Sequence, residues 1–202
     1  MIKMVLFDFG GVLTESGRKG FIAQTLGQLY GQNPATMEIG DLHAVFRRGQ
    51  ANDDVLFDTL NERYGKHVTK EMFLDIVHES FIPAAEVYKL AESLRDHGIH
   101  TGILSNIFNM NVKVLREEGW YEGFDPVILS CEEGYAKPDK EFYSIAVERT
   151  GVAPEEILFI DDQQKCMPPA EAMGMHTLIA VSPAQIVADT KKIIREINGV
   201  DL

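Results

Sequence analysis

Residues 3–16 read KMVLFDFGGVLTES, an apolar run that ends in Asp8 and is followed by two glycines and a turn. The run is continuous rather than alternating, which is typical of a strand covered on both faces. A carboxylate at the end of a buried strand is costly to desolvate. The stretch therefore predicts a central strand whose final acid has a chemical task.

Short apolar runs of the same kind recur along the chain: IHTGILS (99–105), PVILS (126–130), EILFID (156–161) and HTLIAV (176–181). Helical patterns separate several of them. Residues 83–98 start with a proline, carry apolar side chains at helical spacing and end in a glycine, and residues 139–151 also show helical spacing and end in a glycine. This alternation predicts an α/β fold, a Rossmann-like doubly wound parallel sheet.

The segment 15–82 interrupts the alternation. It contains helical patterns and no convincing strand: GFIAQTLGQLY, DLHAVFRRG, DDVLFDTLNERYG and KEMFLDIVHESF. An insertion after the first strand would lie over the carboxyl edge of the sheet, where open α/β sheets bind ligands. We therefore expect a core made of residues 1–14 and 83–202, and a small helical cap made of residues 15–82.

Composition excludes several classes of function. The 202 residues carry a net charge of −12, which argues against nucleic acid or an anionic membrane as partner. The two cysteines lack CxxC spacing, so neither a disulfide framework nor a zinc site is indicated. The sequence shows no secretory signal and no apolar stretch long enough for a membrane span. We expect a cytoplasmic protein; its oligomeric state is not indicated.

Polar residues fall where the predicted strands end or just before a helix begins: Asp8, Ser105, Asn106, Lys137, Asp161 and Asp162. A parallel sheet would bring them to one edge. Three neighbouring carboxylates need a compensating cation, and oxygen ligands favour Mg²⁺. A hydroxyl, backbone amides and a lysine would cradle a phosphoryl group, which one free carboxylate could attack. The set predicts phosphoryl transfer with Mg²⁺ as cofactor.

The ordered segments DFGGVL, ILSN, AKPD and FIDD resemble the four motifs of the haloacid dehalogenase superfamily. The insertion resembles the small helical cap of its subfamily IA, and FRRGQANDDVLFDTL is similar to a segment of that cap. The resemblance covers nearly the whole chain. Within the superfamily the sequence is most similar to sugar-phosphate phosphatases and to the phosphatase domain attached to some epoxide hydrolases.

The resemblance implies a role for each motif residue. Asp8 matches the nucleophile, which is also a metal ligand, and the backbone carbonyl of Gly10 matches a second ligand. Ser105 and Lys137 match residues that hold the phosphoryl group, and Asn106 follows Ser105 as in many members.

The fourth motif offers two adjacent acids to the metal. Counting back from AMGM aligns Asp162 with the direct Mg²⁺ ligand, which leaves Asp161 as an adjacent or water-mediated acid. A shift of one residue would exchange the two, so the order stays open. Cys166 stands where Asn or Asp is common in the family, which would weaken support for the metal.

Gly10 is the main departure from the family pattern, because most phosphatases and mutases carry an acid/base aspartate there. Losing such a group costs about 10² to 10⁴ in rate. Three explanations stay open: a leaving group that needs little protonation, a replacement acid such as Glu15, or a chain that binds phosphate compounds without turning them over efficiently. Mutase and dehalogenase activities are disfavoured.

The sequence therefore predicts a Mg²⁺-dependent phosphomonoester hydrolase that acts on a small phosphorylated metabolite, such as a sugar phosphate, through an aspartyl-phosphate on Asp8. The alternative is a phosphate-metabolite sensor or interaction module. Two simpler interpretations accompany these: Ser105 and Asn106 could cap a helix, and Arg47 and Arg48 are better explained by a solvated helix face than by the cleft.

Overall fold

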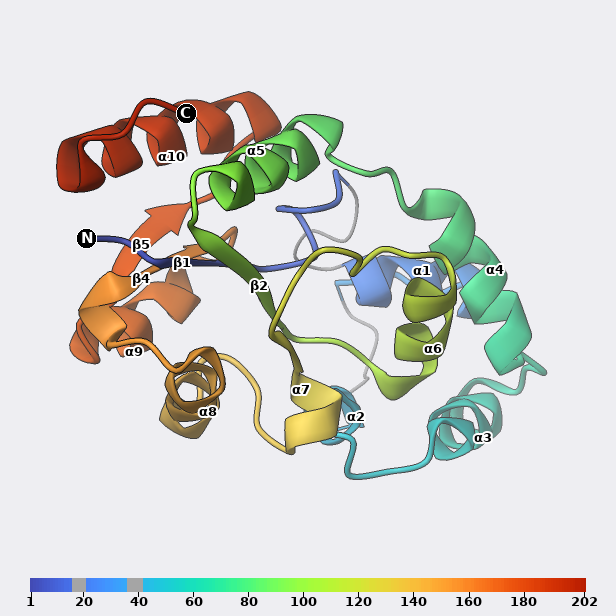
Figure 1. Ribbon diagram of the computed structural model, residues 1–202. Helices are drawn as coiled ribbons and strands as arrows, with labels where there is room; N and C mark the ends of the chain where they lie inside the picture. The colour runs from blue at the N-terminus through green and yellow to red at the C-terminus, as the bar shows by residue number, and fades with distance from the viewer. Residues whose placement is uncertain (16–20, 36–41) are drawn as a thin grey trace.

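The computed structural model describes residues 1–15, 21–35 and 42–202, drawn as ribbon in Figure 1. The strands are β1 (Met4–Phe7), β2 (His100–Ser105), β3 (Val127–Leu129), β4 (Ile157–Asp161) and β5 (His176–Ile179). The helices of the segment between β1 and β2 are α1 (Phe21–Tyr30), α2 (Leu42–Arg47), α3 (Asp53–Tyr64), α4 (Lys70–Ser80) and α5 (Ala85–Asp96). The later ones are α6 (Asn109–Glu117), α7 (Ser130–Glu133), α8 (Lys140–Thr150), α9 (Met167–Ala172) and α10 (Pro183–Asn198), with 3₁₀ turns at Pro154–Glu156 and Gln164–Cys166.

The five strands form one parallel sheet in the order β3-β2-β1-β4-β5. Side chains of β1 alternate between two hydrophobic cores because successive residues of a strand point to opposite faces. Val5 and Phe7 pack into the core on the side of α5 and α10, whereas Met4 and Leu6 pack into the core that includes residues of α8 and α9. Helices therefore cover both faces, which confirms the predicted doubly wound α/β fold.

Two helices predicted from the sequence, α5 and α8, end at or just before a glycine of positive φ. α5 begins two residues after Pro83 and ends just before Gly98, which has a positive φ of 77°. α8 ends at Gly151, which is left-handed with φ 67°. A residue without Cβ adopts this conformation at little cost, so each glycine stops its helix and directs the chain into the following strand.

The helices α1–α4 lie beside the sheet, next to α6 (Figure 1). They share a hydrophobic core with the start of α6: it includes Leu26, Tyr30, Leu56 and Phe73, together with Met110 of α6. In the parts of 15–82 that the structure describes, the regular elements are all helices, as predicted. No helix of the described ranges has the length and apolarity needed to span a bilayer.

The two chain segments that connect this group to the sheet run side by side. The backbone N–H of Glu15 donates to the carbonyl of Ile82 at 2.9 Å, and that of Ala84 donates to the carbonyl of Leu13 at 2.9 Å. These bonds lie at the boundaries expected from the sequence, 14/15 and 82/83. The division into a core and a cap at these positions stays a prediction.

Candidate active site

The parallel register of the sheet places the sequence motifs at one edge. Phe7, the last residue of β1, lies opposite Ile103 of β2 and Ile160 of β4. Asp8 follows Phe7 directly, and Asp161 follows Ile160. Asp8, Asp161 and Asp162 each offer a carboxylate oxygen, and these three oxygens lie within 4.8 Å of one another.

Lys137 reaches this group of acids from the loop before α8. Its side chain is buried, and its Nζ lies 2.9 Å from Oδ1 of Asp8 and 2.6 Å from Oδ2 of Asp161. The same ammonium group donates to the carbonyl of Leu104 at 2.7 Å. Burial lowers the pKa of Lys137, but the charges of Asp161 and Asp8 raise it by more, so the pKa lies above its ordinary value. Lys137 is therefore a permanently charged bridge between two carboxylates.

Asp8 is 5% exposed. Its Oδ1 accepts a hydrogen bond of 2.7 Å from the N–H of Phe9 as well as the contact from Lys137. Burial is the largest influence on this carboxyl and, together with the charges of Asp161 and Asp162, raises its pKa to about 6 against the opposing effect of Lys137. A divalent cation beside the three acids would add the positive charge that keeps Asp8 ionised.

The two adjacent acids of the fourth motif have different surroundings. Both oxygens of Asp161 are bonded, Oδ2 to Lys137 at 2.6 Å and Oδ1 to the N–H of Gln163 at 2.7 Å. Asp161 is fully buried, whereas Asp162 is half-buried. The side chains of this group offer carboxylate oxygens, which are the ligands that Mg²⁺ prefers, so these residues fit the predicted ion.

Asn106 positions Lys137 through the lysine's backbone. Its Oδ1 accepts from the N–H of Lys137 at 2.8 Å, and its Nδ2 donates to the carbonyl of Lys137 at 2.9 Å. Ser105 ends β2 and is 2% exposed. The interpretation of these two residues as helix caps is wrong, because the N-cap residue of α6 is Phe108 and no side chain caps this helix. The predicted contacts of Ser105 and Asn106 with substrate stay predictions.

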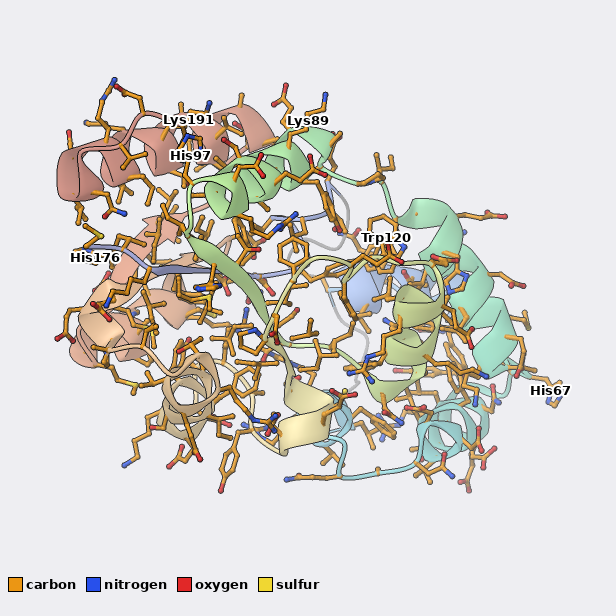
Figure 2. All side chains as sticks on the ribbon, in the orientation of Figure 1. His67, Lys89, His97, Trp120, His176 and Lys191 are labelled. Atoms are coloured by element: carbon orange, nitrogen blue, oxygen red, sulfur yellow. The ribbon has the colours of Figure 1, made fainter. Side chains whose placement is uncertain are left out.

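Phe9 anchors the segment that carries Asp8, a role that sequence analysis missed. Its ring meets those of Phe81, Trp120 and Tyr121 edge-on, with centroids 5.7, 5.7 and 5.4 Å away. Trp120 is labelled in Figure 2, between α5 and α6. The partners come from positions more than 70 residues away along the chain, so no local pattern could have identified them. This aromatic cluster holds the backbone next to the nucleophile candidate.

Comparison with known proteins agrees with this geometry. A model of the haloacid dehalogenase-like hydrolases matches residues 2–174. The chain belongs to the haloacid dehalogenase-like hydrolase family. This confirms the resemblance seen in the motifs; the assignment to the subfamily with the small cap stays a prediction.

Two curated proteins are similar to this chain in sequence. It is 28% identical over 210 residues to acyl-CoA dehydrogenase family member 10 of Mus musculus, in an alignment that covers 95% of this chain and 19% of that protein. The chain thus spans about a fifth of that relative's length. It is 26% identical to sesquiterpene phosphatase astK of Aspergillus oryzae, over 86% of this chain and 87% of that one.

A solved structure shares the fold. It is a haloacid dehalogenase family enzyme of Bacteroides thetaiotaomicron in complex with magnesium and inorganic phosphate, with a TM-score of 0.74 and 23% identity. The match covers 90% of this chain and 96% of that chain. At this identity the likeness shows the shared fold.

The two arginines of the hydrolase's α2 segment do not form a solvated helix face, and that interpretation is wrong. Arg48 pairs with Asp139, with Nη2 2.7 Å and Nε 3.1 Å from the same carboxylate oxygen. Arg47 is half-buried, and its Nη2 donates to the carbonyl of Lys137 at 3.4 Å. Their partners lie about 90 positions away in the sequence, which explains why the pattern of α2 alone misled.

The remaining candidates are exposed or packed. Glu15 is exposed, and its backbone rather than its side chain makes the bond to Ile82. Cys166 is fully buried, and burial raises the pKa of its thiol to about 12. Its carbonyl accepts the hydroxyl of Tyr143 at 2.7 Å, so it serves packing. Figure 2 shows His67, His97 and His176 at the periphery of the molecule.

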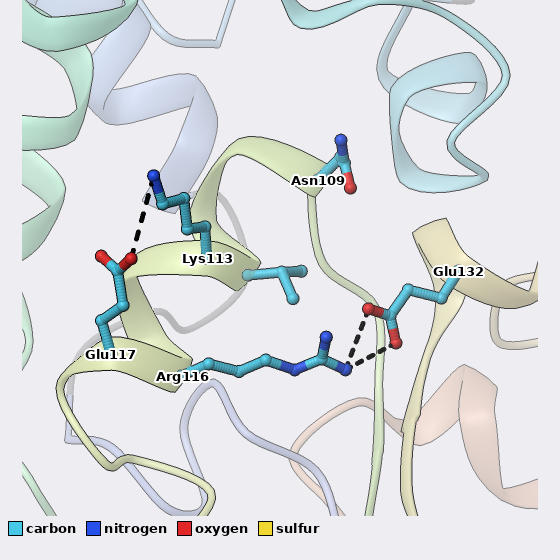
Figure 3. A pocket seen from close by; sticks show the side chains of 6 residues that line it. Asn109, Lys113, Arg116, Glu117 and Glu132 are labelled. Carbon is cyan, nitrogen blue, oxygen red and sulfur yellow. Dashed lines mark hydrogen bonds and ion pairs between the residues drawn. The ribbon is translucent and has the colours of Figure 1, made fainter.

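A hollow of about 380 Å³ lies along α6 and faces α7 (Figure 3). Its lining residues are Asn109, Val112, Lys113, Arg116, Glu117 and Glu132. The cations in it are already paired: Arg116 lies 2.9 Å from Glu132, and Lys113 lies 3.8 Å from Glu117. None of the motif residues lines this hollow, so it is separate from the candidate active site.

Proposed function

We propose that this hydrolase cleaves a small phosphomonoester with the help of Mg²⁺, through an aspartyl-phosphate formed on Asp8. The observation that carries the proposal is the buried contact of Lys137 with both Asp8 and Asp161 beside a third carboxylate. A relative named as a phosphatase and a structural neighbour that holds magnesium and phosphate support the same chemistry.

Asp8, Asp162 and the backbone carbonyl of Gly10 would hold the metal. Asp161 is the less suitable direct ligand, because Lys137 and the N–H of Gln163 occupy both of its oxygens. It would instead orient Lys137 and contact the metal through water. When bound, Mg²⁺ would neutralise the acids and the phosphoryl oxygens, so that an anionic nucleophile can approach an anionic substrate.

The chain's own residues supply the remaining steps. An oxygen of Asp8 forms a bond to phosphorus while the bond to the ester oxygen breaks, and that oxygen leaves with the electron pair. Lys137 and the hydroxyl of Ser105 hold the phosphoryl oxygens during this transfer. Water then attacks phosphorus, and the bond between phosphorus and the oxygen of Asp8 breaks. Inorganic phosphate is released, the carboxylate of Asp8 is restored, and the attacking water loses one proton to solvent.

Gly10 shapes the expected substrate range. Because position 10 holds a glycine, this position cannot donate a proton to the leaving oxygen. The rate should therefore fall steeply as the pKa of the leaving alcohol or phenol rises. Sugar phosphates and sesquiterpenyl phosphates are the two classes to compare, the first from the sequence motifs and the second from the name of the astK relative.

The cap, residues 15–82, would select among these substrates, and the core, residues 1–14 and 83–202, would carry the chemistry. The paired connecting segments at Leu13–Glu15 and Ile82–Ala84 support this division, because they tie the cap to the strand that bears Asp8.

The test is hydrolysis of an activated aryl phosphate, with Mg²⁺ and with a chelator, by the parent protein and by Asp8→Asn. We expect turnover that requires both the metal and Asp8. Turnover that persists in Asp8→Asn would contradict the aspartyl-phosphate. A folded parent protein that binds Mg²⁺ and phosphate without turnover would favour the sensor function instead.

A further inference from the structure

Arg47 reaches from the cap toward the candidate active site. It is the last residue of α2, and its side chain is half-buried. Its Nη2 donates to the carbonyl of Lys137, the same carbonyl that accepts from Asn106. The guanidinium group therefore lies at the point where the backbone of Lys137 enters the site.

The chain around Arg47 is pressed against the core. A Cβ added at Gly49 would collide with the backbone carbonyl of Cys131, so only glycine allows this close approach, and its φ of 62° also suits glycine. Arg48 pairs with Asp139, whose carboxylate also accepts the N–H of Ala136 in the loop that carries Lys137. These contacts dock the end of α2 against that loop without using Arg47.

Arg47 keeps most of its hydrogen-bonding capacity. A guanidinium group has five N–H donors, and among the described residues Arg47 uses one of them, in a bond of 3.4 Å to the carbonyl of Lys137. Arg48, by contrast, donates from Nε and Nη2 to Asp139 and from Nη1 to the carbonyl of Ala44. The first arginine is thus equipped to bind an anion, and the second is used for docking.

The charge of Asp8 acts on the guanidinium of Arg47. Burial lowers the pKa of this guanidinium, and the carboxylate of Asp8 is the strongest of the influences that raise it, ahead of Asp139. Arginine keeps its proton at any working pH. Arg47 therefore keeps a lasting positive charge within electrostatic reach of Asp8.

The charge balance of the site leaves room for such a cation. With three acids ionised and Lys137 protonated, the group carries two net negative charges, which one Mg²⁺ would cancel. A phosphomonoester dianion would bring two more. Further positive charge near its oxygens would lower the electrostatic cost of binding and of the transition state.

We propose that Arg47 binds the leaving oxygen of the phosphoester and stabilises the negative charge that this oxygen gains. The proposal rests on the proposed function. Phosphoryl transfer is in line, so the leaving oxygen lies on the side of phosphorus opposite Asp8, toward the cap. As the bond between phosphorus and this oxygen breaks, the electron pair stays on the oxygen, an N–H of Arg47 donates to it, and a proton from water neutralises it after departure.

This role explains how the site works with Gly10. An acid at position 10 would supply a proton, whereas Arg47 supplies a hydrogen bond and a charge and keeps its own proton. Removing one donor to a developing oxyanion costs about 10² to 10³ in rate. The loss should grow with the basicity of the leaving oxygen, because a more basic oxygen carries more charge that needs stabilisation.

The experiment compares Arg47→Gln with Arg48→Gln on a series of aryl phosphates, from strongly acidic to weakly acidic phenols, and on an alkyl phosphate. We expect Arg47→Gln to steepen the dependence of the rate on leaving-group pKa and to lose about 10² to 10³ on the poorest leaving groups. Arg48→Gln should lower all rates by one common factor, because it only loosens the docking. Arg47→Lys, which keeps the charge, should fall between the parent and Arg47→Gln.

A second measurement separates this proposal from the proposed function. Binding of inorganic phosphate in the presence of Mg²⁺ is measured by calorimetry. Inorganic phosphate is a suitable probe because its fourth oxygen takes the place of the leaving oxygen of the substrate. We expect Arg47→Gln to weaken this binding and Arg48→Gln to change it little. If the parent protein turns over substrate and both variants show the same dependence on leaving-group pKa as the parent, the role of Arg47 is overturned. The proposed function is then unaffected. A parent that neither turns over nor binds phosphate overturns the proposed function and this role together.

Discussion

Replacing Lys137 by methionine removes the ammonium group that lies 2.9 Å from Asp8 and 2.6 Å from Asp161. Methionine fills a similar volume, so the change tests charge more than packing. Removing one partner of a buried ion pair costs about 3–5 kcal/mol, because the other charge stays buried without compensation. For a domain of this size that loss lowers the melting temperature by about 6–20 °C.

The loss should depend on pH. A buried carboxylate without a partner can lose its charge by taking up a proton. For a carboxyl with an ordinary pKa near 4, this protonation costs about 1.4 kcal/mol for each pH unit above the pKa. Protonation therefore costs more than about 5 kcal/mol at pH 8 but only about 1.5 kcal/mol at pH 5. The pKa of Asp8 is already raised to about 6, so at pH 5 Asp8 is largely protonated in the parent protein too. We therefore expect a loss of about 3–5 kcal/mol at pH 8 and at most about 2 kcal/mol at pH 5.

Urea denaturation of the parent and of Lys137→Met, in chelator at both pH values, measures this difference. Lys113→Met is the matched control, since the side chain of Lys113 is 81% exposed and its ion pair with Glu117 is 3.8 Å long. The control should change stability by less than about 0.5 kcal/mol. A Lys137→Met protein as stable as the parent at pH 8, or one whose loss is the same at both pH values, would refute the charge argument.

Three further outcomes follow from the site. Mg²⁺ should raise the melting temperature more at pH 8 than at pH 5: the raised pKa of Asp8, about 6, favours the metal-free fold at low pH, and that contribution is lost as the pH rises through 6. Equal shifts at both values would contradict it. Asn106→Ala should lower turnover about 10-fold to 100-fold, because the backbone of Lys137 loses two hydrogen bonds; Asn109→Ala, in the separate hollow, is the control and should retain full turnover. Glu15→Gln should leave turnover unchanged in a steady-state assay, because Glu15 is exposed, and a large drop would identify it as the replacement acid.

The fold could be predicted because its signals are local. Continuous apolar runs such as residues 157–160 form strands buried on both faces, and glycines such as Gly151 stop helices in the conformation that only they adopt cheaply. In any parallel sheet the residues that follow the strands lie at one edge. That Asp8 and Asp161 are close within this edge follows from the pairing of β1 with β4, which the structure shows.

The roles within the site could not be read in the same way. Asp161 and Asp162 are adjacent residues of the same type, and the motif alone does not show which of them faces Lys137. The sequence also gave no reason to join Asn106 to the backbone of Lys137, 31 residues away. Such contacts depend on side-chain directions and distances within a few tenths of an ångström, which pattern and spacing do not encode.

The sequence by itself determined the sheet, the helical insertion and the chemical kind of the site, because periodicity, helix stops and strand ends are properties of short segments. Only the tertiary structure decided that Asp161 pairs with Lys137, that Phe9 is held by aromatic rings and that Arg47 turns inward while Arg48 docks on Asp139. Each of these contacts joins residues far apart in the chain, and the buried ones are stable only where packing excludes water around both partners.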